Sequence, residues 1–133
     1  MSAWVISLIS VIIGTITGFV LNLLRDEFKE RKKKKQYFND LLKEIEFNEI
    51  VFKEGRRWFE FQTLAYTDTR SAKYFIELPD DLQMDIRNLY AIIFNLHNRN
   101  IEPLNGNIQK VASIAEKIIP KFKEYLKNKK LLI

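Results

Sequence analysis

The sequence has no cysteine, a single histidine, and only 4 glycines and 3 prolines among its 133 residues. The absence of cysteine excludes disulfides and thiolate metal sites and suits a reducing cytoplasm. The one histidine, His97, has no partner from which a metal site or a catalytic triad could be built. We therefore expect no catalytic residues, no metal and no cofactor, and interpret His97 as a residue near the negative end of a helix.

The first stretch of the chain, residues 1–24, contains no Asp, Glu, Lys, Arg or His. At about 1.5 Å per residue a helix of this length reaches roughly 36 Å, enough to cross a bilayer core. A cleaved signal peptide would need a positive start and small residues at a cleavage site, and a buried core helix is usually shorter and interrupted by charge. The stretch therefore predicts a transmembrane helix.

A basic juxtamembrane stalk follows at residues 25–35, with seven basic and three acidic side chains. Because Lys and Arg next to a span are retained in the cytoplasm, we expect a single-pass protein of the cell membrane whose N-terminus is outside and whose C-terminal domain is cytoplasmic. Trp4 would then lie at the outer interface. The stalk's basic block could contact lipid headgroups, although an ordinary topology signal is the preferred interpretation. The block comprises Arg31, Lys32, Lys33, Lys34 and Lys35.

Small or polar residues recur every fourth position in the predicted span: Ser10, Gly14, Gly18 and Asn22. They form one stripe along a helix, and small side chains allow a second helix to approach closely. The stripe predicts helix–helix packing in the membrane. The alternative is that such residues are simply common in membrane helices.

The remaining residues, 36–133, are long enough for one domain. Apolar residues at helical spacing predict helices over about 36–57, 80–99 and 107–129. Nothing between Leu24 and Lys53 breaks a helix, and Gly55 is the first candidate break, so we expect the anchor to continue into the first of them. Pro79, followed by Asp80 and Asp81, marks the start of the second, and Pro120 should kink the third. Asn48 falls on the apolar stripe of the first helix, and we place it at the edge of that stripe.

Residues 56–74 show the least periodicity. Their aromatic residues Trp58, Phe59 and Phe61 are expected to cover the core, with an exposed patch for a partner as the alternative. If this segment is short, three helices pack side by side and the C-terminus lies far from the membrane. If it is a full helix, a four-helix bundle returns residues 127–130 to the bilayer. We prefer the first arrangement. In either case the predicted fold is all-α, with a transmembrane helix continuing into a three- to four-helix bundle.

Four short patterns, together with the anchor and the basic stalk, carry a resemblance: Leu41-Leu42-x-x-Ile45-x-x-Asn48, Ala65-Tyr66, Leu78-Pro79-x-x-Leu82 and Leu89-Tyr90. With these features the chain resembles a broad set of uncharacterised small single-span prokaryotic membrane proteins with a cytoplasmic helical domain. The resemblance covers about residues 1–100. It implies no catalytic residues.

These features favour a non-enzymatic accessory or scaffold subunit whose span associates in the membrane and whose bundle binds a partner. The expected partners are membrane lipid and another membrane protein or copies of itself, with no small-molecule substrate. The alternative is a homo-oligomeric pore-forming or membrane-perturbing effector lined by Ser7, Ser10, Thr17 and Asn22. The formal net charge of +5 lies at the two ends, while residues 36–120 carry ten basic and thirteen acidic side chains. This distribution argues against a nucleic-acid partner.

Overall fold

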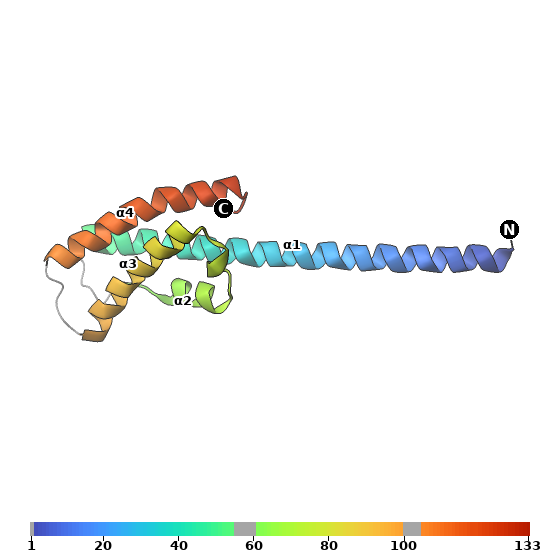
Figure 1. Cartoon of the computed structure of the whole chain (residues 1–133), viewed down its shortest axis with the longest axis horizontal. Coiled ribbons are helices and arrows are strands. Elements are labelled where there is room, and N and C mark those ends of the chain that lie inside the picture. Colours follow the sequence, from blue (N-terminus) through green and yellow to red (C-terminus); the bar gives the residue numbers. More distant parts are fainter. Residues whose placement is uncertain (1, 55–60, 100–104) are drawn as a thin grey trace. The chain divides into compact units, whose positions relative to one another are not determined.

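The computed structural model describes residues 2–54, 61–99 and 105–133, and these residues form helices and connections without a strand. The elements are α1 (Ala3–Lys53), α2 (Leu64–Ser71), the short 3₁₀ helix η2 (Phe75–Glu77), α3 (Asp80–Arg99) and α4 (Asn105–Asn128) (Figure 1). The all-α class predicted from the sequence is confirmed.

The chain divides into two compact units, Met1–Lys33 and Lys34–Ile133. Helix α1 contributes to both, because it continues without a break from Ala3 to Lys53. This continuity agrees with the lack of Gly or Pro between residues 19 and 53. The units are described separately below.

The first unit is a helix whose apolar side chains are exposed. Trp4, Val11, Ile16 and Phe19 all have more than half of their surface open. The helix is long and apolar enough to cross a membrane, and none of its apolar window is buried against the rest of the chain. A helix that is apolar on all sides and unburied is a candidate membrane span.

The second unit is a helical bundle built along the C-terminal part of α1. Helix α4 runs antiparallel to it, since Lys53 pairs with Glu116 at 2.9 Å and Lys123 pairs with Glu46 at 3.3 Å (Figure 1). The core between the helices is continuous and apolar. Its fully buried members include Phe38, Leu41, Ile45, Ile86, Leu89, Ile93, Val111, Ile118 and Phe122.

Residues 61–79 run back along α1 toward Lys34, where the second unit begins. Their contacts with α1 follow in reverse order: Gln62 bonds to Asn48, and Glu77 pairs with Lys34 at 3.0 Å. Helix α3 therefore starts at the Lys34 end of the bundle, and α4 brings the chain back to that end. There the Leu131 carbonyl accepts a hydrogen bond from Asn39 at 2.7 Å.

The preferred three-helix arrangement, which placed the C-terminus at the opposite end of the bundle, is therefore wrong. Residues 61–78 cross the bundle although α2 has only 8 residues. A largely irregular chain rises more per residue than an α-helix, so this segment reverses the direction of the chain as a full helix would.

The start of α3 was predicted correctly. The Pro79 carbonyl accepts the first helical bond from the Gln83 N–H at 2.9 Å, and Asp80 and Asp81 occupy the first turn. Pro79 thus stands just before the helix rather than at its first position. Pro120 lies inside α4, as expected.

The end of α4 is closed by a Schellman motif. The Leu131 N–H bonds to the Leu126 carbonyl at 2.7 Å, the Lys130 N–H bonds to the Lys127 carbonyl at 3.1 Å, and Lys130 has φ 56°. Leu126 and Leu131 are both buried, which supplies the hydrophobic contact usual in this motif. Glycine normally occupies the left-handed position because a side chain there costs energy.

Lys130→Gly should therefore raise the free energy of unfolding by about 1 kcal/mol. Urea unfolding of the full chain in detergent, followed by circular dichroism, measures the change. Lys130→Ala is the control, since it removes the same charge but keeps the strained backbone. An equal gain from both substitutions would contradict this explanation.

Candidate functional site

The small residues predicted to pack in the membrane lie on α1 in the first unit. A Cβ atom built on Gly14 or Gly18 meets nothing within 4 Å, so this stripe is open in the single chain. Ser10 and Asn22 are exposed as well.

The basic stalk residues differ in their surroundings. Arg31, Lys32 and Lys33 are exposed, whereas Lys34 and Lys35 are half-buried at the start of the bundle. The Lys34 ammonium is engaged by Glu77. The five residues therefore do not form one uniform basic surface.

The aromatic residues of the proposed partner patch are only partly described. Phe61 is buried in the core with 6% of its surface exposed, so it covers the core as the preferred interpretation held. Trp58 and Phe59 lie outside the described residues, and so does the side chain of His97.

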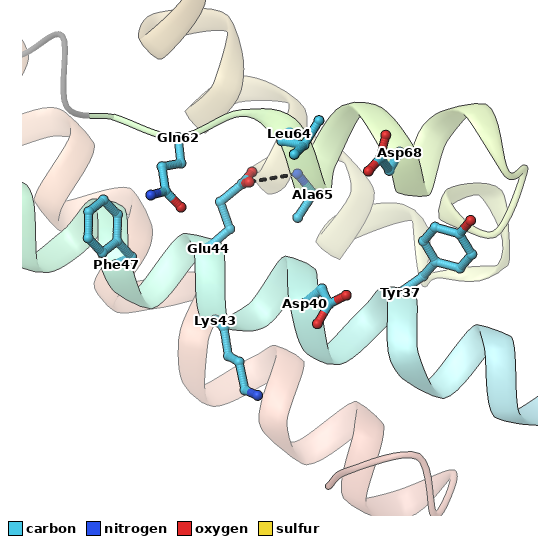
Figure 2. Close-up of a pocket in the computed structure, with 9 residues that line it drawn as sticks. All are labelled: Tyr37, Asp40, Lys43, Glu44, Phe47, Gln62, Leu64, Ala65 and Asp68. Atoms are coloured by element: carbon cyan, nitrogen blue, oxygen red, sulfur yellow. Dashed lines mark hydrogen bonds between the residues drawn. The ribbon is translucent and has the colours of Figure 1, made fainter.

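Sequence reasoning did not single out the Glu44 carboxylate, which accepts hydrogen bonds from both α2 and α3. Glu44 is 6% exposed. Its carboxylate accepts a hydrogen bond from the Ala65 N–H at 2.7 Å (Figure 2). It accepts another from the Tyr66 N–H at 3.2 Å. It also accepts one from the Tyr90 hydroxyl at 2.6 Å. One side chain of α1 thus joins α2 and α3.

Glu44 acts as the cap of α2. The residue before that helix, Thr63, makes no side-chain capping bond, so the first N–H groups of α2 need another acceptor. The Glu44 carboxylate supplies it from a different helix. Its negative charge also lies at the positive end of the α2 dipole.

Tyr90 completes this cluster. Its ring is fully buried and stacks on Tyr66, with centroids 4.1 Å apart and planes 6° from parallel. Burial raises the pKa of the Tyr90 hydroxyl well above its usual value, and the nearby Glu44 carboxylate raises that pKa further. Tyr90 therefore remains a protonated donor to Glu44 at neutral pH.

Two asparagines of α1 hold other segments of backbone. Asn48 donates to the Gln62 carbonyl at 2.9 Å and accepts from the Gln62 N–H at 2.8 Å. Because Asn48 is fully buried, its predicted position at the edge of the stripe is wrong. Asn39 likewise donates to the Leu131 carbonyl and accepts from the Ile133 N–H at 3.1 Å. Each carboxamide satisfies backbone groups that α1 could not reach with its own backbone.

A cavity of about 470 Å³ lies beside the Glu44 cluster, between α1 and the chain that precedes and begins α2. In Figure 2 the Lys43 side chain points away from α2. Most of the lining surface is apolar, and three carboxylates and one lysine lie among the apolar and aromatic residues. It comprises Tyr37, Asp40, Lys43, Glu44, Phe47, Gln62, Leu64, Ala65 and Asp68. Among the residues with described positions, no group of three or more His, Cys, Asp or Glu side chains could hold a metal ion.

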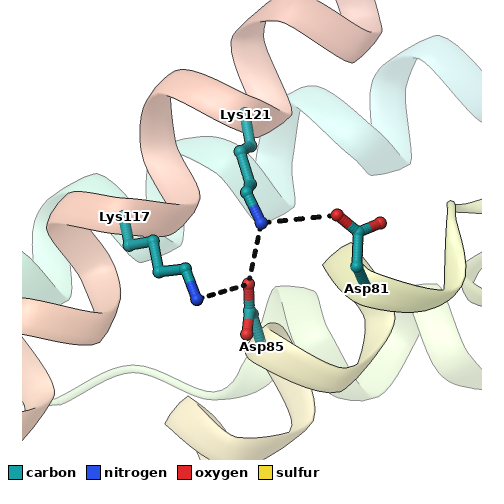
Figure 3. A network of polar contacts seen from close by, with 4 residues as sticks. All are labelled: Asp81, Asp85, Lys117 and Lys121. Carbon is teal, nitrogen blue, oxygen red and sulfur yellow. Dashed lines mark hydrogen bonds and ion pairs between the residues drawn. The ribbon is translucent and has the colours of Figure 1, made fainter.

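Ion pairs join α3 to α4 on another side of the bundle (Figure 3). The Lys121 ammonium lies 3.3 Å from Asp81 and 3.4 Å from Asp85, and Lys117 lies 3.8 Å from Asp85. The bond to Lys121 lowers the pKa of the Asp81 carboxyl, and the bonds to Asp81 and Asp85 raise the pKa of Lys121. The side chains of Lys117, Lys121 and Asp81 are exposed and that of Asp85 is half-buried, so these pairs contribute little net stability.

Comparisons with protein-family models, with curated proteins and with solved structures find no match to this chain.

Removing the Glu44 carboxylate should destabilise the bundle strongly, because two backbone N–H groups and a hydroxyl then lose their acceptor. We expect Glu44→Ala to lower the free energy of unfolding by about 3 kcal/mol and Tyr90→Phe by about 2 kcal/mol, with a double mutant that loses less than the sum. Urea unfolding of the full chain in detergent measures these values.

The matched control is Glu46→Ala. Glu46 lies on α1 as Glu44 does, but its side chain is 38% exposed and pairs with Lys123 of α4. This substitution should cost less than about 1 kcal/mol. Amide exchange at Ala65 and Tyr66 should accelerate in Glu44→Ala and not in Glu46→Ala. Equal losses of stability from the two glutamates would refute the capping role.

The raised pKa of Tyr90 makes part of the stability sensitive to alkali. In the unfolded chain Tyr90 ionises near pH 10 and in the folded chain only at higher pH. Its contribution is therefore complete below about pH 10 and is lost as the pH rises from there toward the folded pKa.

Between about pH 9.5 and 11 the wild type should lose more stability than Tyr90→Phe, measured by urea unfolding at each pH. Tyr125→Phe serves as the control, because the pKa of half-buried Tyr125 is raised less, by burial and the Glu77 charge. Parallel pH profiles for the wild type and Tyr90→Phe would show that the Tyr90 hydroxyl is not held protonated.

Proposed function

We propose that this protein is a non-enzymatic, membrane-anchored accessory or scaffold subunit. Its first 24 residues cross the cell membrane with the N-terminus outside, and residues 36–133 form a cytoplasmic helical bundle. The span packs against another span, from a second membrane protein or a second copy of this chain, through Ser10, Gly14, Gly18 and Asn22. The bundle binds or braces a partner.

The observation that carries this proposal is the contrast between the two units. The apolar side chains of the first unit are left exposed, while the second unit has a continuous core of its own. Exposed apolar surface on this scale requires lipid or protein to cover it. An internal core allows the bundle to keep its shape while lipid or another protein covers the span.

The stripe on α1 gives the span a packing face. Since nothing in the single chain lies within 4 Å of a Cβ at Gly14 or Gly18, these glycines are not required to fit α1 against its own chain. Close approach of a second helix is a use for them that fits an open stripe. The seven basic residues of the stalk support the cytoplasmic placement of the bundle.

Gly14→Leu with Gly18→Leu should abolish association of the span, because two bulky side chains keep a second backbone away. Chemical crosslinking and size-exclusion chromatography in mild detergent measure the assembly, and mass spectrometry of a native-membrane preparation identifies its members. Ile9→Leu with Ile16→Leu introduces the same side chains on the opposite face and should leave the assembly intact. An unchanged assembly in the glycine double mutant would contradict the proposal that the span packs through this stripe.

A further inference from the structure

The cavity beside the Glu44 cluster lies within the second unit, and its volume of about 470 Å³ is usual for a ligand site. Tyr37, Asp40 and Phe47 line it from α1, and their spacing of three and seven residues places them on one face of that helix. Asp68 lines it from α2, and Figure 2 shows Asp40 and Asp68 on facing walls. Tyr37 and Phe47 are ten residues apart, so the lining extends about 15 Å along α1.

The lining carries a surplus of negative charge. It contains the carboxylates of Asp40, Glu44 and Asp68 against one ammonium, that of Lys43. The Lys43 side chain points away from α2 (Figure 2), so its charge lies at the edge of the cavity. Glu44 is bonded by two backbone N–H groups and a hydroxyl, which are neutral donors and leave its charge in place.

Asp40 and Asp68 have no cation of their own. The Asp40 carboxylate accepts a hydrogen bond from the neutral Gln36 amide at 3.1 Å. Among the residues whose positions are described, neither aspartate forms a salt bridge. Both are exposed, so a group from outside the chain can reach them.

The basic residues nearest in sequence to these aspartates do not line the cavity. Lys34 has an acidic partner elsewhere, and the Arg70 guanidinium lies 5.5 Å from the centre of the Tyr66 ring. Lys35 and Lys73 are not among the lining residues either. The two aspartates therefore offer acceptors that no neighbouring cation of this chain occupies.

Apolar surface surrounds these charges. Most of the lining surface is apolar, the rings of Tyr37 and Phe47 are half-buried, and Leu64 is 71% exposed. The cavity thus suits a cation that carries apolar surface of its own. An arginine side chain has this chemistry, because its planar guanidinium pairs with carboxylates and stacks on aromatic rings while its aliphatic stem packs on apolar groups.

We propose that this cavity binds an arginine side chain presented by a segment of a partner protein. The guanidinium lies between Asp40 and Asp68, and the stem lies against the aromatic rings. The exposed Leu64 favours a protein segment over a free small cation, because the residues that flank the arginine cover this apolar side chain. This inference deepens the proposed function and rests on it, since it names what the bundle recognises in its partner.

A short arginine peptide tests the proposal on the full chain in maltoside micelles. The probe is acetyl-Gly-Leu-Arg-Leu-Gly-amide, and the amide resonances of isotope-labelled protein report where it binds. Resonances of residues 37–47 and 62–68 should shift and saturate. A peptide with citrulline in place of arginine keeps the shape without the charge, and it should bind about tenfold more weakly.

Asp40→Asn with Asp68→Asn should weaken binding of the arginine peptide about tenfold and leave binding of the citrulline peptide unchanged, which also shows that the cavity is still folded. The matched control is Asp80→Asn with Glu124→Gln, which removes two exposed carboxylates outside the cavity and should change the affinity less than about twofold. Lys43→Gln should tighten binding of the arginine peptide about twofold, because it removes the one cation of the lining.

Equal affinities for the arginine and citrulline peptides, or equal losses in the two double mutants, would overturn the proposal. Propylguanidinium, the arginine side chain alone, is the third probe. If it binds as tightly as the arginine peptide, the occupant is a free cation and the partner segment is wrong.

Mass spectrometry of the native-membrane preparation separates failure of this site from failure of the proposed function. If another protein copurifies with the chain while the arginine peptide does not bind, only the arginine site is wrong. If the chain purifies alone and the peptide does not bind, binding of a partner protein by the bundle fails as well.

Discussion

The bundle depends on polar side chains of α1 that are buried and fully engaged. Glu44 is the central one, because its carboxylate serves the N-terminus of α2 and the Tyr90 hydroxyl of α3 together. A buried carboxylate is costly unless each of its oxygens finds donors, and here both oxygens do. The same group therefore fixes where α2 begins and which side of α3 faces it.

Asn48 and Asn39 extend this arrangement in both directions along α1. They lie four residues after and five residues before Glu44, and each holds a non-helical segment of backbone. Apolar packing alone would allow the chain between α1 and α3 to slide, since apolar contacts are not directional. Hydrogen bonds to particular backbone groups allow only one register. The packed core and these three residues consequently perform different tasks, one driving compaction and the other selecting the arrangement.

The sequence predicted the regular elements well and their connections poorly. The α3 bounds, the continuity of α1 and the apolar stripe with Phe38, Leu41 and Ile45 all follow from helical spacing and from the breakers at Gly55 and Pro79. The burial of Asn48 could not be predicted in the same way. A polar residue on an apolar stripe is buried only if a partner exists, and the partner of Asn48, Gln62, belongs to an irregular segment. Glu44 was missed for the same reason. A useful signal was present, since Glu44 and Asn48 stand four residues apart on the face that carries Leu41 and Ile45. The return of the C-terminus was missed because residues 61–78 cross the bundle largely without helical periodicity.

The contacts of α1 differ greatly in sequence separation, and this sets an order in which the bundle can form. Asn48 meets a residue 14 positions later and Glu44 one 21 positions later, but Asn39 waits for partners 92 and 94 positions later. A ribosome delivers the chain from its N-terminus, so α1 is synthesised long before the residues that complete its polar stripe. Until residues 131–133 emerge, the Asn39 carboxamide has the Lys35 carbonyl of its own helix as an acceptor but lacks its two distant backbone partners. Because residues 131–133 follow the rest of the bundle in the sequence, the Lys34 end of the bundle closes only after the rest of the bundle has been synthesised.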